Sequence, residues 1–146
     1  MLEVEIKKLS NDASYYFDNT NAQIITLHHQ TYQLDFQKLF PDKHGQFSKR
    51  CWKLPKASNN SLDTLSHPFP DKIKLSKTGG ILAIQYGNIL QFFNVNKSSN
   101  HLEIPGYSFN SKEEIHEFFW TGKSTILLIY QNCIRTLLIN DKCRVT

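Results

Sequence analysis

Apolar and polar positions follow one another along the chain in short runs that polar turns separate. Residues 72–75 (KIKL) alternate, residues 76–80 are turn-like, and residues 81–84 (ILAI) are continuously apolar. A second turn at 86–88 (YGN) precedes an apolar run over 89–95. Alternation predicts a strand covered on one face, and a short continuous apolar run predicts a strand buried on both faces. The stretch therefore predicts three antiparallel strands.

The last part of the chain repeats this plan. A strand predicted over 115–120 leads into a turn at 121–124, a strand over 125–130, a hairpin at 131–132 and a strand over 133–139. Leu75 and Trp120 hold equivalent places, each just before its turn, 45 residues apart. A repeat of about 40–45 residues with about four strands is typical of a β-propeller blade.

The first part of the chain fits the same plan more loosely. It predicts strands over 14–17, 23–27 and 31–36, with a turn at 18–21. Residues 41–70 hold four of the five prolines and are predicted to form a loop inserted between blades. A short strand inside that loop, over 47–54, is predicted to add the outer edge of the first blade.

These patterns predict an all-β fold, namely a partial WD-like β-propeller with about three blades of antiparallel strands. The whole chain, 1–146, is interpreted as the N-terminal part of one propeller, with units at about 12–40, 70–97 and 113–140. Propellers close with typically 4–8 blades, because each sheet buries its faces against its neighbours. The chain is therefore expected to be a fragment, a truncated product or part of an assembly that completes the ring. Adjacent aromatics such as Phe92-Phe93 are interpreted as packing between blades rather than stacking on nucleic-acid bases.

Composition and charge narrow the function further. The net charge of +4 comes from scattered residues, and this disfavours nucleic-acid binding, although weak, salt-dependent binding is kept as an alternative. The start of the sequence has no apolar stretch typical of a signal peptide, and no apolar run approaches the length of a membrane helix, so the protein is expected in the cytoplasm. Cys51, Cys133 and Cys143 are interpreted as unreactive thiols, because their spacing fits neither disulfides nor zinc.

Three motifs that resemble catalytic or metal sites are interpreted as structural. Residues 121–125 (TGKST) resemble the end of a phosphate-binding loop, but Glu117 stands where the motif needs glycine and a β-rich run follows. His116-Glu117 lacks the second histidine of a zinc helix, since position 120 is Trp. His28-His29 are predicted to point to opposite faces of a strand. The sequence thus predicts no enzyme, with no catalytic, cofactor-binding or metal-binding residue and no small-molecule substrate. A nucleotide-binding enzyme using residues 122–124 is kept as an alternative.

Several of these motifs together resemble a known family. Residues 15–18 (YYFD) with 21–24 (NAQI), residues 72–76 (KIKLS) leading to 81–85 (ILAIQ), and residues 115–121 ending in FWT are similar to the N-terminal propeller of the regulator of the Mon–Ccz complex, a family that includes Bulli in flies and the colon cancer-associated Mic-like protein. Members are similar in having a seven-bladed propeller followed by a helical region.

The resemblance implies a non-catalytic scaffold subunit of a guanine-nucleotide exchange complex. That complex activates the late-endosomal Rab GTPase in endosome, lysosome and autophagosome trafficking. Its expected partners are the Mon- and Ccz-type subunits, its membrane association is expected to be peripheral and indirect, on late endosomes and lysosomes, and no cofactor is implied. The alternative is the propeller of another scaffold, either a vacuolar-sorting tether or a kinetochore protein.

Overall fold

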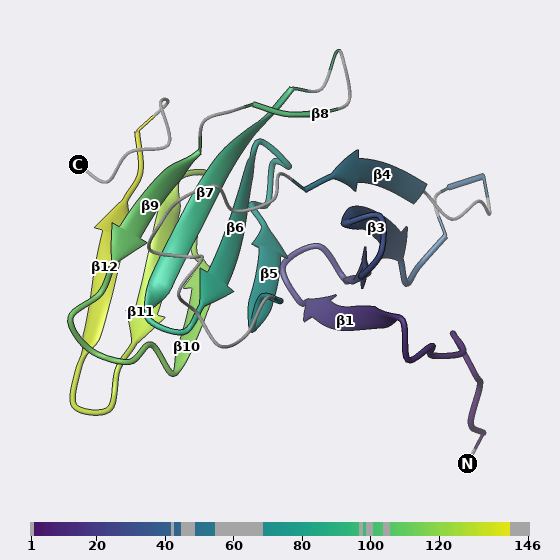
Figure 1. The fold of residues 1–146 in the computed structure, drawn as a ribbon, viewed down its shortest axis with the longest axis horizontal. Helices are drawn as coiled ribbons and strands as arrows, with labels where there is room; N and C mark the ends of the chain where they lie inside the picture. Colours follow the sequence, from purple (N-terminus) through teal and green to yellow (C-terminus); the bar gives the residue numbers. More distant parts are fainter. Residues whose placement is uncertain are drawn as a thin grey trace.

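The computed structural model describes residues 2–41, 43–44, 49–54, 69–96, 98, 101–103 and 106–140. All its regular elements are β-strands, which pair into three antiparallel sheets (Figure 1). Among these residues, no helix is long and apolar enough to span a bilayer.

The first sheet has the strand order β1-β2-β3-β4. Its strands are β1 (Ala13–Asp18), β2 (Gln23–His28), β3 (Gln33–Lys38) and β4 (Lys49–Lys53). Strand β4 lies within the predicted outer-edge segment 47–54 and pairs with β3, which confirms that this loop returns to the first sheet.

The second sheet has the order β5-β6-β7, and β8 and β9 both pair with the far edge of β7. These strands are β5 (Lys72–Leu75), β6 (Ile81–Tyr86), β7 (Ile89–Asn96), β8 (His101–Leu102) and β9 (Tyr107–Asn110). The hairpin between β6 and β7 turns at Gly87, whose φ of 60° lies in the left-handed region that suits glycine.

The third sheet has the order β10-β11-β12. Its strands are β10 (Glu117–Trp120), β11 (Thr125–Ile129) and β12 (Ile134–Leu138). Each is shorter than the run predicted from the sequence: residues 115–116, 130, 133 and 139 lie outside the strands. The predicted turn 121–124 and hairpin 131–132 are both present.

Two apolar cores hold the three sheets together, with the second sheet in the middle. Strand β6 is buried on both faces. Leu82, Ile84 and Tyr86 join the core shared with the first sheet, and Ile81 and Ala83 join the core shared with the third. Phe93 lies in the core shared with the first sheet, and its neighbour Phe92 lies in the core shared with the third sheet. This confirms the interpretation that the two rings pack between sheets. Period-two alternation across a doubly covered sheet produces this division.

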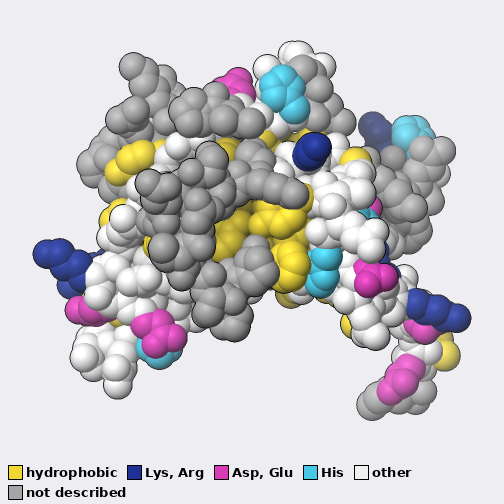
Figure 2. Space-filling view, viewed as in Figure 1, with side chains coloured by type: hydrophobic (Ala, Val, Ile, Leu, Met, Phe, Trp, Pro, Cys, Tyr) yellow, Lys and Arg dark blue, Asp and Glu magenta, His cyan; other side chains and the backbone are white. Residues whose placement is uncertain are grey.

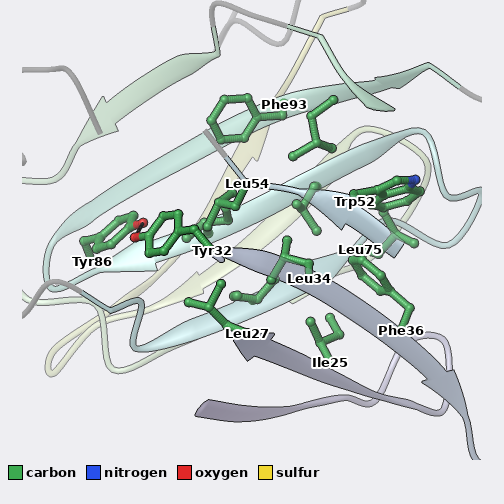
Figure 3. Close-up of a cluster of buried hydrophobic side chains, with 14 of the residues drawn as sticks. Ile25, Leu27, Tyr32, Leu34, Phe36, Trp52, Leu54, Leu75, Tyr86 and Phe93 are labelled. Atoms are coloured by element: carbon green, nitrogen blue, oxygen red, sulfur yellow. Dashed lines mark hydrogen bonds between the residues drawn. The ribbon is translucent and has the colours of Figure 1, made fainter. Parts of the chain in front are cut away.

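Figure 3 shows the core between the first and second sheets. The rings of Phe36 and Trp52 lie 4.6 Å apart between centroids. The hydroxyl oxygens of Tyr32 and Tyr86 lie 3.5 Å apart, so a polar contact crosses an otherwise apolar layer. Burial, together with the contact to Tyr32, raises the pKa of the Tyr86 hydroxyl.

The predicted fold class is confirmed: the chain is an all-β, partial propeller-like structure of three antiparallel sheets. The limits of the predicted blade units and the single-domain assignment of 1–146 stay predictions. Most of the predicted loop 41–70 lies outside the described residues, as does Cys143.

Candidate protein-interaction surfaces

The first strands of the three sheets, β1, β5 and β10, lie next to one another, since β5 contacts both β1 and β10. Phe17, Leu75 and Trp120 occupy equivalent places on them, opposite Ile24, Leu82 and Ile126 of the following strands. The predicted equivalence of Leu75 and Trp120 is therefore seen in the strand pairing. In a propeller the first strand of every blade faces the central axis, so these three strands correspond to the channel side.

A cleft of about 390 Å³ opens along these inner strands. Its walls combine aromatic and charged side chains, among them Tyr15, Phe17, Asp71, Lys72, Glu117 and Phe119. Apolar rings beside charged groups make the cleft suitable for contact with another protein segment.

A charged cluster forms one wall of the cleft. Glu117 Oε2 lies 2.9 Å from Lys72 Nζ, and Glu117 Oε1 lies 3.0 Å from Lys74 Nζ. Lys74 also donates to the carbonyl oxygen of Phe118 at 2.7 Å, and its side chain is only 7% exposed. Burial alone raises the pKa of Glu117, but hydrogen bonds from Lys72, Lys74 and the Phe118 N–H outweigh it and hold the pKa below its usual value. The cluster joins the second sheet to the third.

A second polar joint connects the first sheet to the second. Asp18 is fully buried, and its Oδ2 accepts hydrogen bonds from Gln23 Nε2 at 2.7 Å, Asn21 Nδ2 at 3.0 Å and the Leu75 N–H at 3.3 Å. Asn21 Nδ2 also donates to the carbonyl oxygen of Leu75 at 2.7 Å. Nearby, the Tyr16 hydroxyl donates to the carbonyl oxygen of Pro70 at 2.7 Å, and burial raises the pKa of Tyr16 to about 12.

The outer face of the third sheet carries apolar side chains, and the described residues form no further sheet over it. The side of this sheet opposite the core carries five hydrophobic residues: Phe119, Leu127, Ile129, Ile134 and Leu138. Ile134 is 64% exposed and Leu138 is 56% exposed. Figure 2, which has the same viewpoint as Figure 1, shows hydrophobic side chains gathered in the middle of one face of the molecule. Exposed apolar groups of this kind mark interaction surfaces.

The TGKST segment forms the predicted turn between β10 and β11. The Thr121 N–H donates to the carbonyl oxygen of Thr125 at 2.9 Å, and the carbonyl oxygen of Ser124 accepts from the Ile139 N–H at 2.9 Å. The strand β11 follows, so the positive end of a helix dipole is not available here to hold a phosphate.

The histidine motifs and cysteines also take part in ordinary contacts. His28 Nε2 lies 2.6 Å from Asp35 Oδ2, while His29 pairs with Ser14 and stacks on Phe69. The carboxylate of the His116-Glu117 pair is bound by the two lysines described above. Cys51 and Cys133 are free thiols, and burial together with a hydrogen bond to Asp35 raises the pKa of Cys51, which lowers its reactivity.

The sequence did not single out the two polar joints. Lys74 reads as a solvent-facing residue of an alternating strand, yet it is only 6% exposed overall, because the third sheet covers that face of β5. A signal was available in Asp18: a charged residue directly before a turn, with Asn21 and Gln23 close behind, is a typical local hydrogen-bonding pattern.

Comparison with known families matches residues 15–145 to the region described as "Regulator of MON1-CCZ1 complex, N-terminal". The chain belongs to this family. The match spans all three sheets and both polar joints, and it confirms the resemblance found in the three sequence motifs. By that description, the family contains regulators of the MON1-CCZ1 complex.

Among solved structures, the chain is similar to a crystal structure of a protein from Lactobacillus plantarum. The TM-score is 0.51 and the sequence identity is 14%. The match covers 91% of this chain and 39% of that protein, so this chain spans well under half of the longer structure. At this identity the likeness supports the fold alone. A search of curated proteins gave no match.

Proposed function

We propose that this chain is a non-catalytic scaffold subunit of a MON1-CCZ1 guanine-nucleotide exchange complex, which activates the late-endosomal Rab GTPase. In this role it docks the MON1- and CCZ1-type subunits and leaves nucleotide exchange to them. The family match over residues 15–145 is the observation that carries the proposal. We further propose that the protein is cytoplasmic and reaches late endosomes and lysosomes, including during autophagy, through these partners.

The architecture supports a binding role. Three sheets fixed to one another by two apolar cores and two polar joints form a rigid support, and rigid supports commonly present binding surfaces at loops and exposed faces. The inner-strand cleft, with its aromatic rings beside Lys72 and Glu117, and the apolar outer face of the third sheet are the two surfaces that suit protein partners.

Co-purification tests the proposal. When the tagged chain is expressed in cells of the organism that it comes from, it is expected to recover MON1- and CCZ1-type subunits together. Recovery of vacuolar-sorting tether subunits or kinetochore proteins in their place would assign the chain to the alternative scaffolds. A tagged chain that is folded by circular dichroism and recovers neither MON1- nor CCZ1-type subunits contradicts the proposal.

The nucleotide-binding alternative has its own test. If the turn at residues 122–124 bound ATP or GTP, equilibrium dialysis would detect binding that Lys123→Ala abolishes. We expect no binding to either the original chain or the variant, because a hairpin turn followed by β11 does not aim several backbone N–H groups at one anion.

A further inference from the structure

The outer edge of the second sheet is formed by β9, together with the two-residue strand β8. The two faces of this sheet are covered, one by the first sheet and the other by the third. Strand β9 lies at the end of the sheet opposite the inner strand β5 (Figure 1). Neighbouring blades of a propeller pack on each other's faces and leave the outer edges at the circumference. The edge at β9 is therefore a surface that the neighbouring sheets do not cover.

The pairing of β9 with β7 fixes which of its backbone groups point outward. The Ser111 N–H, one residue beyond β9, donates to the carbonyl oxygen of Asn88 at 2.8 Å. In an antiparallel ladder, residues that bond to the neighbouring strand alternate with residues whose N–H and C=O groups point away from it. Because Ser111 faces the β6–β7 hairpin, Phe109 faces β7 as well. The N–H and C=O groups of Ser108 and Asn110 therefore point outward.

The outward groups of β9 have no strand beside them in the part of the chain that the structure describes. Strand β9 pairs with β7 alone, and no backbone hydrogen bond reaches Ser108 or Asn110 from the outer side. Asn110 is exposed and Ser108 is partly exposed. A row of unpaired N–H and C=O groups at a sheet edge is a template for a further strand. These two residues offer donors and acceptors in alternation, which only an extended backbone can match.

The outer edge of the first sheet provides a contrast. By sequence, its edge strand β4 (KRCWK) holds three cationic residues among five. Charged residues, above all lysine, discourage the addition of another strand at an edge. Strand β9 (YSFN) holds no charged residue, and its two aromatic residues are of the kind that strands favour. Of these two outer edges, β9 is the one suited to accept a strand.

The side chains of β9 indicate which sequence pattern fits beside it. Tyr107 and Phe109 pack against the apolar core shared with the third sheet. Ser108 and Asn110 alternate with them and lie on the opposite side of the strand. A strand added at this edge places its own alternate side chains beside these two rows. An extended segment that alternates apolar and polar residues, without proline at the positions that donate to β9, matches both rows.

We propose that an extended segment of the MON1-CCZ1 pair adds to the second sheet beside β9, through hydrogen bonds with the N–H and C=O groups of Ser108 and Asn110. This inference rests on the proposed role of the chain as a docking subunit. It assigns the contact to one edge of the fold and to backbone groups of two residues.

Amide hydrogen exchange, resolved residue by residue, tests this contact on the unmodified chain. The N–H groups of Ser108 and Asn110 should exchange rapidly in the free chain and about tenfold or more slowly once the purified MON1-CCZ1 pair is added. The Phe109 N–H points to β7 in both states, so it is the internal control and should exchange slowly throughout.

A proline variant tests the same contact by affinity. Ser108→Pro removes an outward N–H without removing a bond to β7, and proline is tolerated at such edge positions, so the variant is expected to fold. It should weaken binding of the pair about tenfold or more. Lys53→Pro is the matched control. The Leu54 N–H donates to the carbonyl oxygen of Tyr32, so the Lys53 N–H points outward from the first sheet, and this variant should bind normally.

The outcomes separate this inference from the docking role. If a complex forms in which Ser108 and Asn110 exchange as fast as in the free chain, the contact at β9 is overturned and the docking role stands. A folded Ser108→Pro variant that binds normally has the same meaning. An unmodified, folded chain that binds no pair contradicts the docking role and this inference with it. Slow exchange of the two groups at high chain concentration without the pair shows that a second copy occupies the edge, which also overturns the inference.

Discussion

The Nζ atom of Lys74 lies 3.0 Å from the Oε1 atom of Glu117, across the junction of the second and third sheets. The Trp120 indole N–H donates to the carbonyl oxygen of Lys74 at 3.1 Å, so backbone and side chain of one residue both connect the two sheets. The lysine is almost fully buried, and its ammonium group also lies 4.4 Å from the centre of the Phe119 ring. A buried ammonium needs such partners, because its desolvation is costly.

Removing the carboxylate from this junction is expected to destabilise the protein. Glu117→Gln leaves the buried Lys74 without its charge partner and should lower the free energy of unfolding by about 1–3 kcal/mol. Lys72→Met removes the more exposed of the two lysines that bind Glu117, and should lower the free energy of unfolding by less than about 1 kcal/mol. Urea denaturation followed by tryptophan fluorescence measures both. Equal effects of the two variants would show that burial of Lys74 contributes nothing.

The same carboxylate predicts a dependence on pH. The folded state holds the pKa of Glu117 below its ordinary value of 4.5. The contribution of the ionised Glu117 carboxylate to the free energy of unfolding is therefore complete above pH 4.5. It is lost as the pH falls through the lower pKa of the folded state. The difference in unfolding free energy between the original chain and Glu117→Gln should therefore be constant from about pH 7 to 5 and shrink below about 4. A difference that grows on acidification contradicts the lowered pKa.

The joint between the first and second sheets depends on an acceptor at position 18. Asp18→Ala removes the oxygen that serves Gln23 and the Leu75 N–H, and should destabilise the fold by about 2–4 kcal/mol. Asp18→Asn retains an amide oxygen that can accept these bonds, so it should recover most of the loss. Thermal unfolding of both variants measures the effect, with the exposed Asp12→Ala as control. If the asparagine variant is as unstable as the alanine variant, the acceptor role is wrong.

Gly106 lies where a side chain does not fit. A Cβ atom at this position would approach the Phe93 ring to 2.6 Å and the carbonyl oxygen of Phe92 to 2.7 Å. Gly106→Ala should therefore shift β9 and cost about 1–3 kcal/mol of stability. Gly122→Ala is the matched control, because the nearest atom there is 3.9 Å away, and it should be nearly neutral. Chemical denaturation of both variants compares them. Equal midpoints would contradict the close approach of β9 to β7.

Much of the fold was predictable because a doubly covered sheet has a clear pattern. The continuous apolar run at 81–84 and the adjacent Phe92-Phe93 can be satisfied only by cores on both faces, and this is what the second sheet has. The 45-residue spacing between Leu75 and Trp120 indicated a repeating unit of the length of one propeller blade. Strand β9 was not predicted, because residues 101–110 mix apolar, glycine and proline residues without alternation.

The surfaces were less predictable, because they depend on contacts between residues far apart in sequence. Nothing local distinguishes buried Lys74 from the more exposed Lys72, which lies two residues earlier on the same face of the same strand. The difference arises from β10, whose Phe118 carbonyl oxygen accepts from Lys74. Likewise, the two faces of the third sheet have similar sequences. Leu127 lies on the outer face and its neighbour Leu128 lies in the core, and both are leucine. Only the order of the sheets shows which face is open.

Direct binding of the purified chain to the purified MON1-CCZ1 pair tests the central claim, that this chain is a docking subunit of the complex. Biolayer interferometry with immobilised chain is expected to show saturable binding with a dissociation constant of about 1 μM or tighter. Binding should be independent of added nucleotide, because the chain takes no part in exchange. Folded chain that binds no pair at concentrations up to about 100 μM would contradict the account.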